Sequence, residues 1–548
     1  MEGESRGLRP RMGSVTLCLL TTLYLLIVPN QTFWTRSYDY LGADPVVYAA
    51  FVIGVSALML ALLTTFSVKY LTKPILIFFV IVSSSASWFN DQFGVIIDKD
   101  MIRNAAVTTQ AESAHLITLT FVTHIFLTGI LPSLLILWVR VVHRPFIKKF
   151  VWNMAVILPC LAIFLAAGLG FSRTFAAVGR EHKDLVLTLN PVVPIVSTIR
   201  YAVEAERDRH VVVQPLGEDA HQRSAGVGGK PRVTIIVAGE TARAQNFSLG
   251  GYARDTNPEL AKQDIVYFPN STSCGTATAT SIPCMFSVYT RATYKHSKAL
   301  ETENLLDVLG HARIGVTWWD NDTGSYGVTA RAPYTFLPAA ADPRFCRDGE
   351  CHDTVLLDKL DNWLNNVKGD SVLVLHQLGS HGPAYYQRYP EEFRRFTPDC
   401  RTAEFGKCTP EEIVNAYDNT ILFTDHVVSS VIDHLKQHAD KISGSMIYLS
   451  DHGESLGENG LYLHGTPYVI APPQQTHVPI LVWLDKDFRA SSGVDMACLK
   501  AGADAPHSHD NLFHSVLGLM DVATKVYDPS LDLFAACRGK PNTVALAD

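Results

Sequence analysis

Two adjacent residues that can bind a metal ion follow an apolar run late in the chain. The segment Ser450–Ser455 reads Ser-Asp-His-Gly-Glu-Ser and comes directly after Met446–Leu449. The carboxylate of Asp451 and the imidazole of His452 are both ligands that zinc accepts. If the apolar run is a strand, both side chains lie at the carboxyl edge of a sheet, where open α/β folds bind their ligands. Asp-His pairs also occur in solvated turns, so the other ligands must come from elsewhere in the chain.

A third ligand is expected after an earlier apolar run. Glu240 follows Val233–Val237 and would lie at the same sheet edge as Asp451. The alternative is a glutamate that the macrodipole favours at a helix N-terminus, and for this residue alone that alternative is the stronger one.

A loop of small and hydroxyl-bearing residues, Ser273–Cys284, is closed by two cysteines and contains Thr278. A single threonine in such a loop is commonly a turn residue without chemistry. Here Thr278 would complete a tetrahedral zinc site with Glu240, Asp451 and His452. Because zinc lowers the pKa of a coordinated hydroxyl, Thr278 would become a nucleophile for phosphoryl transfer.

Two more histidines, His381 and His464, stand in glycine-flanked loops. Either one could be a surface residue in a turn. Together with the ligands above they form a set of acids and histidines suited to zinc, and the set as a whole is harder to explain by chance.

The first third of the chain is dominated by apolar runs long enough to cross a bilayer, roughly 17 to 25 residues each. We place five spans at Met12–Val28, Val46–Phe66, Pro74–Phe89, His115–Val139 and Val151–Phe171. The first is read as a retained anchor, because no small-residue cleavage pattern follows it. Basic residues, including Arg6, Arg9 and Arg11, concentrate on the flanks of one side. That side is predicted to be cytoplasmic, and an odd number of spans then exports everything after Phe171.

Charge and cysteine positions agree with an exported domain. The net charge of −7 gives no indication of nucleic-acid binding. Three closely spaced cysteine pairs without metal-binding spacing are expected to form disulfides in an oxidising compartment: Cys274/Cys284, Cys346/Cys351 and Cys400/Cys408. Pairing Cys498 with Cys537 is a hypothesis.

Short β-rich runs alternate with helical segments in the exported part. The expected strands are Val233–Val237, Ile265–Phe268, Ile314–Trp318, Ser371–Leu375, Ser445–Leu449 and Val478–Leu484. One helix is well marked, since Thr409, Pro410 and Glu412 fit an N-cap, a first-turn proline and a capping box ahead of Ile413–His438. This alternation predicts an α/β domain with a mostly parallel sheet covered by helices on both faces.

The predicted protein is therefore multidomain. Residues 1–172 form an α-helical transmembrane bundle of five spans, and residues 232–548 form the periplasmic catalytic α/β domain. Residues 173–231 connect them, with Leu185–Val203 as an interfacial helix and Glu204–Pro231 as a linker.

Several long motifs in one order resemble a known family. They are Gly239–Arg243, Ser273–Thr278, His376–Pro383, Tyr417–Asn419 and Ser450–Glu458. The chain is similar, over nearly its whole length, to the membrane-bound phosphoethanolamine transferases that modify lipid A and confer polymyxin resistance. The resemblance implies an alkaline phosphatase and sulfatase-like domain in which Thr278 is the nucleophile and Glu240, Thr278, Asp451 and His452 hold one zinc ion. His381 and His464 match positions used for substrate phosphate or a second zinc.

The resemblance also implies the reaction and its setting. Thr278 attacks phosphatidylethanolamine, diacylglycerol leaves, and the phosphoethanolamine on the threonine passes to a phosphate of lipid A in lipopolysaccharide. The enzyme would be a monomer in the inner membrane of a Gram-negative cell, in contact with membrane lipids and not with nucleic acid.

Asn104, Thr108 and Glu112 match polar positions around the phosphoethanolamine headgroup in this family. Their spacing would place them on one helix face, and Glu112 could meet the ammonium group. The spacing alone fits the solvated face of a short interfacial helix better.

One segment departs from the family. Where similar transferases show Trp-Arg-Asp-Asn followed by a lysine, this chain has Trp318–Thr329 with Tyr326 at the lysine position. Ser325 and Thr329 stand where cysteines often flank the lysine. A phenol cannot act as a cationic phosphate clamp, so Arg331 or Lys295 substitutes, or phosphate binding depends more on metal and histidine. Thr323, in the same segment, is assigned to substrate binding.

Two other classes of function remain open. A phosphoglycerol transferase or a phosphate or sulfate ester hydrolase of the same superfamily would use a similar metal centre. A membrane sensor or envelope-assembly protein would hold only a structural metal, and the reactive hydroxyl of Thr278 argues against that.

Overall fold

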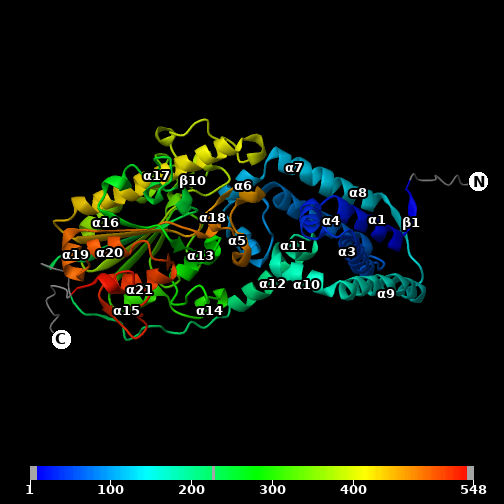
Figure 1. Cartoon of the computed structure of the whole chain (residues 1–548), viewed down its shortest axis with the longest axis horizontal. Coiled ribbons are helices and arrows are strands. Elements are labelled where there is room, and N and C mark those ends of the chain that lie inside the picture. Colours follow the sequence, from blue (N-terminus) through cyan, green and yellow to red (C-terminus); the bar gives the residue numbers. More distant parts are fainter. Residues whose placement is uncertain (1–8, 225–228, 540–548) are drawn as a thin grey trace, which may run out of the picture. The chain divides into compact units, whose positions relative to one another are not determined.

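The computed structural model describes residues 9–224 and 229–539, so Arg6 lies outside the described residues. The chain forms two compact units (Figure 1). The first, here called the helical unit, comprises residues up to Ile102 together with Ile117–Tyr201. The second, here called the sheet unit, comprises Arg103–Leu116 and the chain from Ala202 onward. A short segment between two apolar helices therefore belongs to the sheet unit.

From residue 9 onward, the helical unit contains four helical stretches long and apolar enough to cross a membrane. They are α3 (Pro45–Thr65), α4 (Thr72–Phe93), the stretch Leu119–Trp138 and α9 (Phe146–Gly170). The first predicted span is the shorter helix α1 (Ser14–Ile27), which a bend of 69° separates from α2 (Gln31–Leu41). Counted as one span, this bent pair is the fifth, and the predicted helical membrane domain is confirmed.

The predicted fourth span begins too early. Its helix starts at Leu119, where the hydroxyl of Thr118 caps the backbone N–H of Phe121 at 3.2 Å. His115 instead lies in the separate helix α6 (Gln110–Leu116) of the sheet unit.

A seven-stranded sheet forms the centre of the sheet unit. Its order is β5 (Ile265–Phe268), β15 (Ile480–Leu484), β12 (Ser443–Ser450), β4 (Arg232–Gly239), β11 (Ser371–His376), β7 (Gly315–Asp320) and β8 (Tyr334–Phe336). The strands from β12 to β8 are parallel, whereas β15 is antiparallel to both of its neighbours. The predicted mostly parallel sheet is confirmed. The exposed three-residue edge strand β8 was not predicted, because so short a run carries no alternating pattern.

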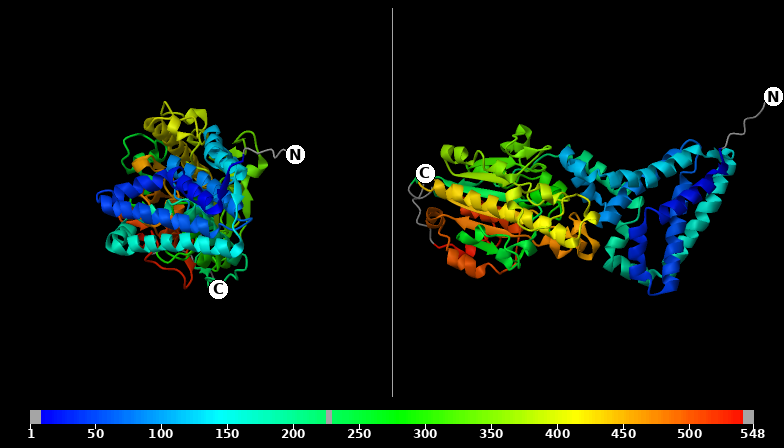
Figure 2. Two further views of the ribbon diagram at one scale, coloured as in Figure 1. Left: turned by 90° about the vertical axis from the view of Figure 1, so that its right-hand side faces the viewer. Right: turned by 90° about the horizontal axis from the view of Figure 1, so that it is seen from above.

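Helices lie on both faces of this sheet. The long helix α17 (Pro410–Gln437) runs along one side, and α15 (Leu305–His311) and α21 (Asp510–Leu519) lie on the other (Figures 1 and 2). Every residue of β4 and of β12 is buried, as expected for strands covered on both faces.

The N-terminus of α17 has the predicted capping box. The Thr409 hydroxyl accepts from the Glu412 N–H at 3.3 Å, and the Glu412 carboxylate accepts from the Thr409 N–H at 2.7 Å. Pro410 occupies the first helical turn, where its missing N–H costs nothing.

The segment between the units is more ordered than predicted. Helix α12 (Val192–Asp208) contains most of the predicted interfacial stretch but extends through Asp208, so the first residues of the predicted linker Glu204–Pro231 are helical. Farther along, β3 (His221–Gln222) pairs with β17 (Val522–Ala523). The pairing of β3 with β17 anchors part of the supposed linker to the sheet unit.

All four cysteine pairs form disulfides, including the hypothetical one: Cys274–Cys284, Cys346–Cys351, Cys400–Cys408 and Cys498–Cys537. Cys18 and Cys160 are buried free thiols in the apolar helices.

Thr409→Ala is expected to lower the free energy of unfolding by about 1 kcal/mol, because it removes the acceptor that caps α17. The measurement is the urea midpoint of the purified protein followed by tryptophan fluorescence. Thr409→Ser keeps the hydroxyl and should retain most of the stability. Equal midpoints for Thr409→Ala and the wild type would contradict this account.

Candidate functional site

Strand register brings the candidate ligands to one edge of the sheet. Gly239 at the end of β4 pairs with Ser450 at the end of β12, so Glu240 and Asp451 leave the sheet at the same level. His376 at the end of β11 pairs with Ala238 on one side and with Asp320 of β7 on the other. The residues at or just past the ends of four parallel strands therefore lie together at this edge of the sheet.

The four predicted zinc ligands form a single buried cluster. The Thr278 hydroxyl lies 3.2 Å from Oε2 of Glu240 and 3.3 Å from Nε2 of His452. The same Nε2 lies 3.3 Å from Oδ2 of Asp451 and 3.6 Å from Oε1 of Glu240. All four residues are buried, and none has more than 3% of its surface exposed.

The orientation of His452 and Asp451 fits a metal site. Nδ1 of His452 lies 2.9 Å from the Gly453 carbonyl, so we assign the proton to Nδ1 and the lone pair to Nε2, which faces the cluster. Oδ1 of Asp451 accepts from the backbone N–H groups of Thr241 and His452, at 3.1 and 2.7 Å. Oδ2 of Asp451 has no hydrogen-bond partner among the described residues and remains available to a cation.

The electrostatics of the cluster also favour a bound cation. Burial and the charge of Asp451 raise the pKa of Glu240 well above its usual value, and burial raises the pKa of Asp451 to about 7. Burial lowers the pKa of His452 and keeps its imidazole neutral. Two buried carboxylates beside a neutral imidazole call for a positive charge, and this donor set suits zinc.

Thr278 is held at the start of helix α13 (Thr278–Met285) by links to the strand that carries the ligands. The Ser281 hydroxyl donates to the Asp451 carbonyl and accepts from the Gly275 N–H at 3.0 Å. The Cys274–Cys284 disulfide joins the loop to the helix. The N-terminus of α13 presents backbone N–H groups on the side of the hydroxyl, an arrangement that binds phosphate.

His509 forms a second link to this loop. Its Nδ1 accepts from the Cys274 N–H at 3.1 Å, and its Nε2 donates to the Ser450 carbonyl at 2.8 Å. Burial lowers the pKa of His509 to about 4, which keeps the ring neutral as these two bonds require. No sequence motif indicated this role, because His509 lies far along the chain from both partners.

The structure places both predicted loop histidines beside the cluster. The ring centroids of His464 and His452 are 4.4 Å apart, and those of His464 and His381 are 5.5 Å apart. Glu454 accepts from Nδ1 of His464 at 2.9 Å. Burial alone would lower the pKa of His464, but the charge of Glu454 outweighs it and raises the pKa.

Glu112 also reaches this group, since its Oε1 lies 3.2 Å from Nε2 of His381. Burial raises the pKa of Glu112 to about 7. Helix α6, which carries Glu112, is further fixed by His115, whose Nε2 lies 2.9 Å from Oε2 of Glu350.

Asn104 and Thr108 do not share a continuous helix with Glu112, contrary to the prediction. Helix α5 (Lys99–Val107) contains Asn104 and ends before Thr108, whose hydroxyl donates to the Asn104 carbonyl at 2.9 Å. The three residues therefore lie in α5, in the connection after it and in α6.

The Tyr326 segment lies at the same edge of the sheet. The Tyr326 hydroxyl bonds to Thr323, whose hydroxyl donates to Oδ2 of Asp322 at 3.0 Å. Ser325 and Thr329 are hydrogen-bonded at 2.6 Å where similar transferases often have cysteines. Arg331 does not replace the lysine, because both of its bonding nitrogens are held by Asp307 at 2.6 and 2.7 Å. Lys295 is exposed at the start of α14 (His296–Leu300).

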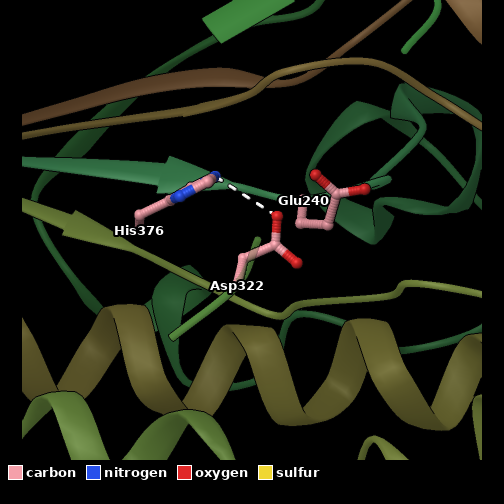
Figure 3. Close-up of side chains that lie close together, drawn as sticks. All are labelled: Glu240, Asp322 and His376. Atoms are coloured by element: carbon pink, nitrogen blue, oxygen red, sulfur yellow. Dashed lines mark ion pairs between the residues drawn. The ribbon is translucent and has the colours of Figure 1, made fainter. Parts of the chain in front are cut away.

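Two buried residues were missed as site members, namely Asp322 and His376. Together with Glu240 they form a second group whose potential ligand atoms lie within 4.8 Å of one another (Figure 3). The available signal was their position at the carboxyl ends of parallel strands: His376 ends β11, which lies next to β4, and Asp322 follows β7, which lies next to β11.

Comparison with known proteins identifies the family. Residues 55–205 match the family model described as phosphoethanolamine transferase EptA/EptB, and residues 232–522 match the sulfatase model. Phosphoethanolamine transferase EptA of Escherichia coli strain K12 is 41% identical over 97% of this chain and 98% of its own. The chain belongs to the phosphoethanolamine transferase family.

Two further relatives of this transferase support the assignment. Phosphatidylethanolamine transferase Mcr-1 of Escherichia coli is 37% identical over 96% of this chain and 99% of its own. The integral membrane lipooligosaccharide phosphoethanolamine transferase A of Neisseria meningitidis has a structure that matches 96% of this chain and 100% of its own, with 37% identity and a TM-score of 0.92. The predicted family and fold class are confirmed.

His509→Ala is expected to lower the rate of phosphoethanolamine transfer about ten- to a hundredfold, because small displacements of a nucleophile are that costly. The zinc content should stay near the wild-type value, since His509 is not in the cluster. Transfer from labelled phosphatidylethanolamine and metal analysis of the same preparation test both points. Wild-type transfer rates in a folded His509→Ala variant would rule out this positioning role.

Proposed function

We propose that this transferase moves phosphoethanolamine from phosphatidylethanolamine to a phosphate of lipid A, through a covalent intermediate on Thr278. The observation that carries the proposal is the buried Thr278 hydroxyl, within 3.3 Å of both Glu240 and His452 at the start of a helix. A metal site with a purely structural role would not need a buried hydroxyl beside its ligands at the start of a helix.

The two substrates are proposed from the relatives. The name of Mcr-1 states that it transfers phosphatidylethanolamine, which supports the donor. The Neisseria meningitidis enzyme is described as acting on lipooligosaccharide, which supports a lipid A acceptor. Added phosphoethanolamine would lower the negative charge of the cell surface and thereby reduce polymyxin binding.

In the first step, the Thr278 oxygen attacks the phosphorus of the donor, and the bond from phosphorus to the diacylglycerol oxygen breaks. The hydroxyl proton leaves along the bond that Thr278 donates to Oε2 of Glu240. The diacylglycerol oxygen takes the bonding electrons and a proton, which the raised pKa of His464 keeps at the site. In the second step, a protonated oxygen of a lipid A phosphate attacks the same phosphorus and gives its proton to His464. The bond from phosphorus to the Thr278 oxygen breaks, and that oxygen takes the bonding electrons and regains a proton from Glu240.

Glu240, Thr278, Asp451 and His452 are proposed to hold the zinc ion. When bound there, zinc would favour the alkoxide of Thr278 and offset negative charge on the phosphoryl group. His464, His381 and the N-terminus of α13 are proposed to bind the phosphoryl oxygens from the protein side.

The ethanolamine headgroup is proposed to lie near Glu112. Because burial raises the pKa of Glu112 to about 7, its ionised form gains most from a cationic partner, and the ammonium group supplies one. Asn104, Thr108 and Thr323 are proposed to contact the same substrate with their polar side chains.

We further propose a multi-pass protein of the Gram-negative inner membrane, active as a monomer, with its α/β domain in the periplasm. The four disulfides support an oxidising compartment. The proposed domain limits are residues 1–172, 173–231 and 232–548.

Thr278→Ala is expected to leave a folded, membrane-inserted protein that adds no phosphoethanolamine to lipid A, because it removes the attacking oxygen. Mass spectrometry of lipid A from expressing cells measures the product. Thr278→Ser keeps a hydroxyl and should retain some transfer. Continued modification by Thr278→Ala would exclude this nucleophile, and release of free phosphoethanolamine by the wild type without transfer would favour a hydrolase.

Tyr326→Lys is expected to preserve or increase transfer, since an ammonium group would add a charged contact for phosphate. Tyr326→Phe is the matched control, because it removes only the hydroxyl that bonds to Thr323. The measurement is transfer from labelled phosphatidylethanolamine. Loss of transfer in a folded Tyr326→Lys protein would show that the phenol has a positive role.

A further inference from the structure

A second group of possible metal ligands adjoins the proposed zinc centre. It consists of Glu240, Asp322 and His376, with one ligand atom from each within 4.8 Å of the others (Figure 3). All three are buried, with at most 4% of any residue exposed. Glu240 also belongs to the group that it forms with Asp451 and His452, so its carboxylate stands between the two sets of ligands.

His376 is oriented in the way that metal-binding histidines usually are. Its Nδ1 lies 3.0 Å from Oδ2 of Asp320, which also accepts from Nε1 of Trp318 at 2.9 Å. Oδ1 of Asp320 accepts from the N–H groups of Asp322 and Gly324 at 3.0 and 3.2 Å. Asp320 is thus fully engaged in holding the ring, and a carboxylate on one nitrogen leaves the other nitrogen to face a metal.

His376 and Asp322 each have one buried polar atom without a partner. Nε2 of His376 and Oδ1 of Asp322 make no hydrogen bond to any of the described residues. The side chains of both residues are at least 99% buried. A buried polar atom without a partner costs free energy, and here two such atoms belong to residues of one group.

An ion pair without metal does not account for the arrangement. If His376 were simply protonated, its Nε2–H would need an acceptor, yet the nearer carboxylate oxygen of Asp322 lies 3.7 Å away, beyond hydrogen-bonding distance. Asp320 and Asp322 place negative charge around the ring of His376, and this charge favours a divalent cation at Nε2.

We propose that Glu240, Asp322 and His376 bind a second divalent transition-metal ion, with Glu240 shared between it and the proposed zinc centre. One imidazole and two carboxylates suit zinc or manganese, whereas magnesium and calcium prefer oxygen ligands alone. Because Glu240 is shared, the inference rests on the proposed function. It is distinct from a second zinc at His381 and His464, which lie around His452 rather than around His376.

The hydrogen bond that Asp322 receives from a side chain comes from a neutral group. The Tyr326 phenol bonds to Thr323, whose hydroxyl donates to Oδ2 of Asp322, so neither residue supplies positive charge. A second cation would offset the charge of Asp322.

The test is the number of metal ions per chain in the full-length protein, purified in detergent and equilibrated with zinc alone or manganese alone. Elemental mass spectrometry is expected to find two ions in the wild type and one in each of Asp322→Asn and His376→Gln. Asp451→Asn should also hold one, and His464→Gln should keep two. A value of one in the wild type with both metals would overturn the second site and leave the first standing, whereas zero would overturn both.

Loss of the second ion in His464→Gln, together with its retention in Asp322→Asn, would assign it to the other histidines and overturn the inference. If a variant does not fold, anomalous scattering from wild-type crystals decides the question. A metal peak among Glu240, Asp322 and His376 is expected, and a map without one there would overturn the site.

Discussion

The burial of negative charge at one sheet edge is the constraint on which the rest of the structure depends. Parallel pairing of β7, β11, β4 and β12 forces Asp322, Glu240 and Asp451 into one small region that water scarcely reaches. Carboxylates in such a place are costly unless a cation or a proton compensates them. The same parallel pairing that makes a stable, fully covered sheet therefore creates a site that selects positive charge.

The neighbouring elements are arranged to add a hydroxyl and a phosphate-binding surface to this charge. Helix α13 begins at Thr278, and its loop is tied to β12 through Ser281 and His509. Helix α6, far away in the sequence, adds Glu112 and is held by the His115 contact with Glu350. The Thr278 hydroxyl is therefore positioned by bonds to β12, the strand that ends next to Asp451 and His452.

The sequence was sufficient for the elements whose signal is local. The six expected strands, the capped helix α17 and the three closely spaced disulfides all depend on patterns within a few residues. The break between α5 and α6 was missed, because the spacing of Asn104, Thr108 and Glu112 in the sequence is the same whether or not one helix continues through them. His376 and Asp322 were missed for a different reason: their importance comes from which strands are neighbours, and strand order is a long-range property that no short motif contains.

The surroundings of Asp322 show how strand pairing leaves negative charge without a positive side chain to offset it. Tyr326 reaches Asp322 through Thr323, and a phenol supplies no positive charge to a buried carboxylate. The structure retains Asp322 and His376 at full burial and orients His376 through Asp320, although each of these features is unfavourable without a nearby cation. Arg331 is held by Asp307 and cannot provide that charge. A bound ion that shares Glu240 is thus the simplest compensation, because it uses only ligands that the sheet already brings together.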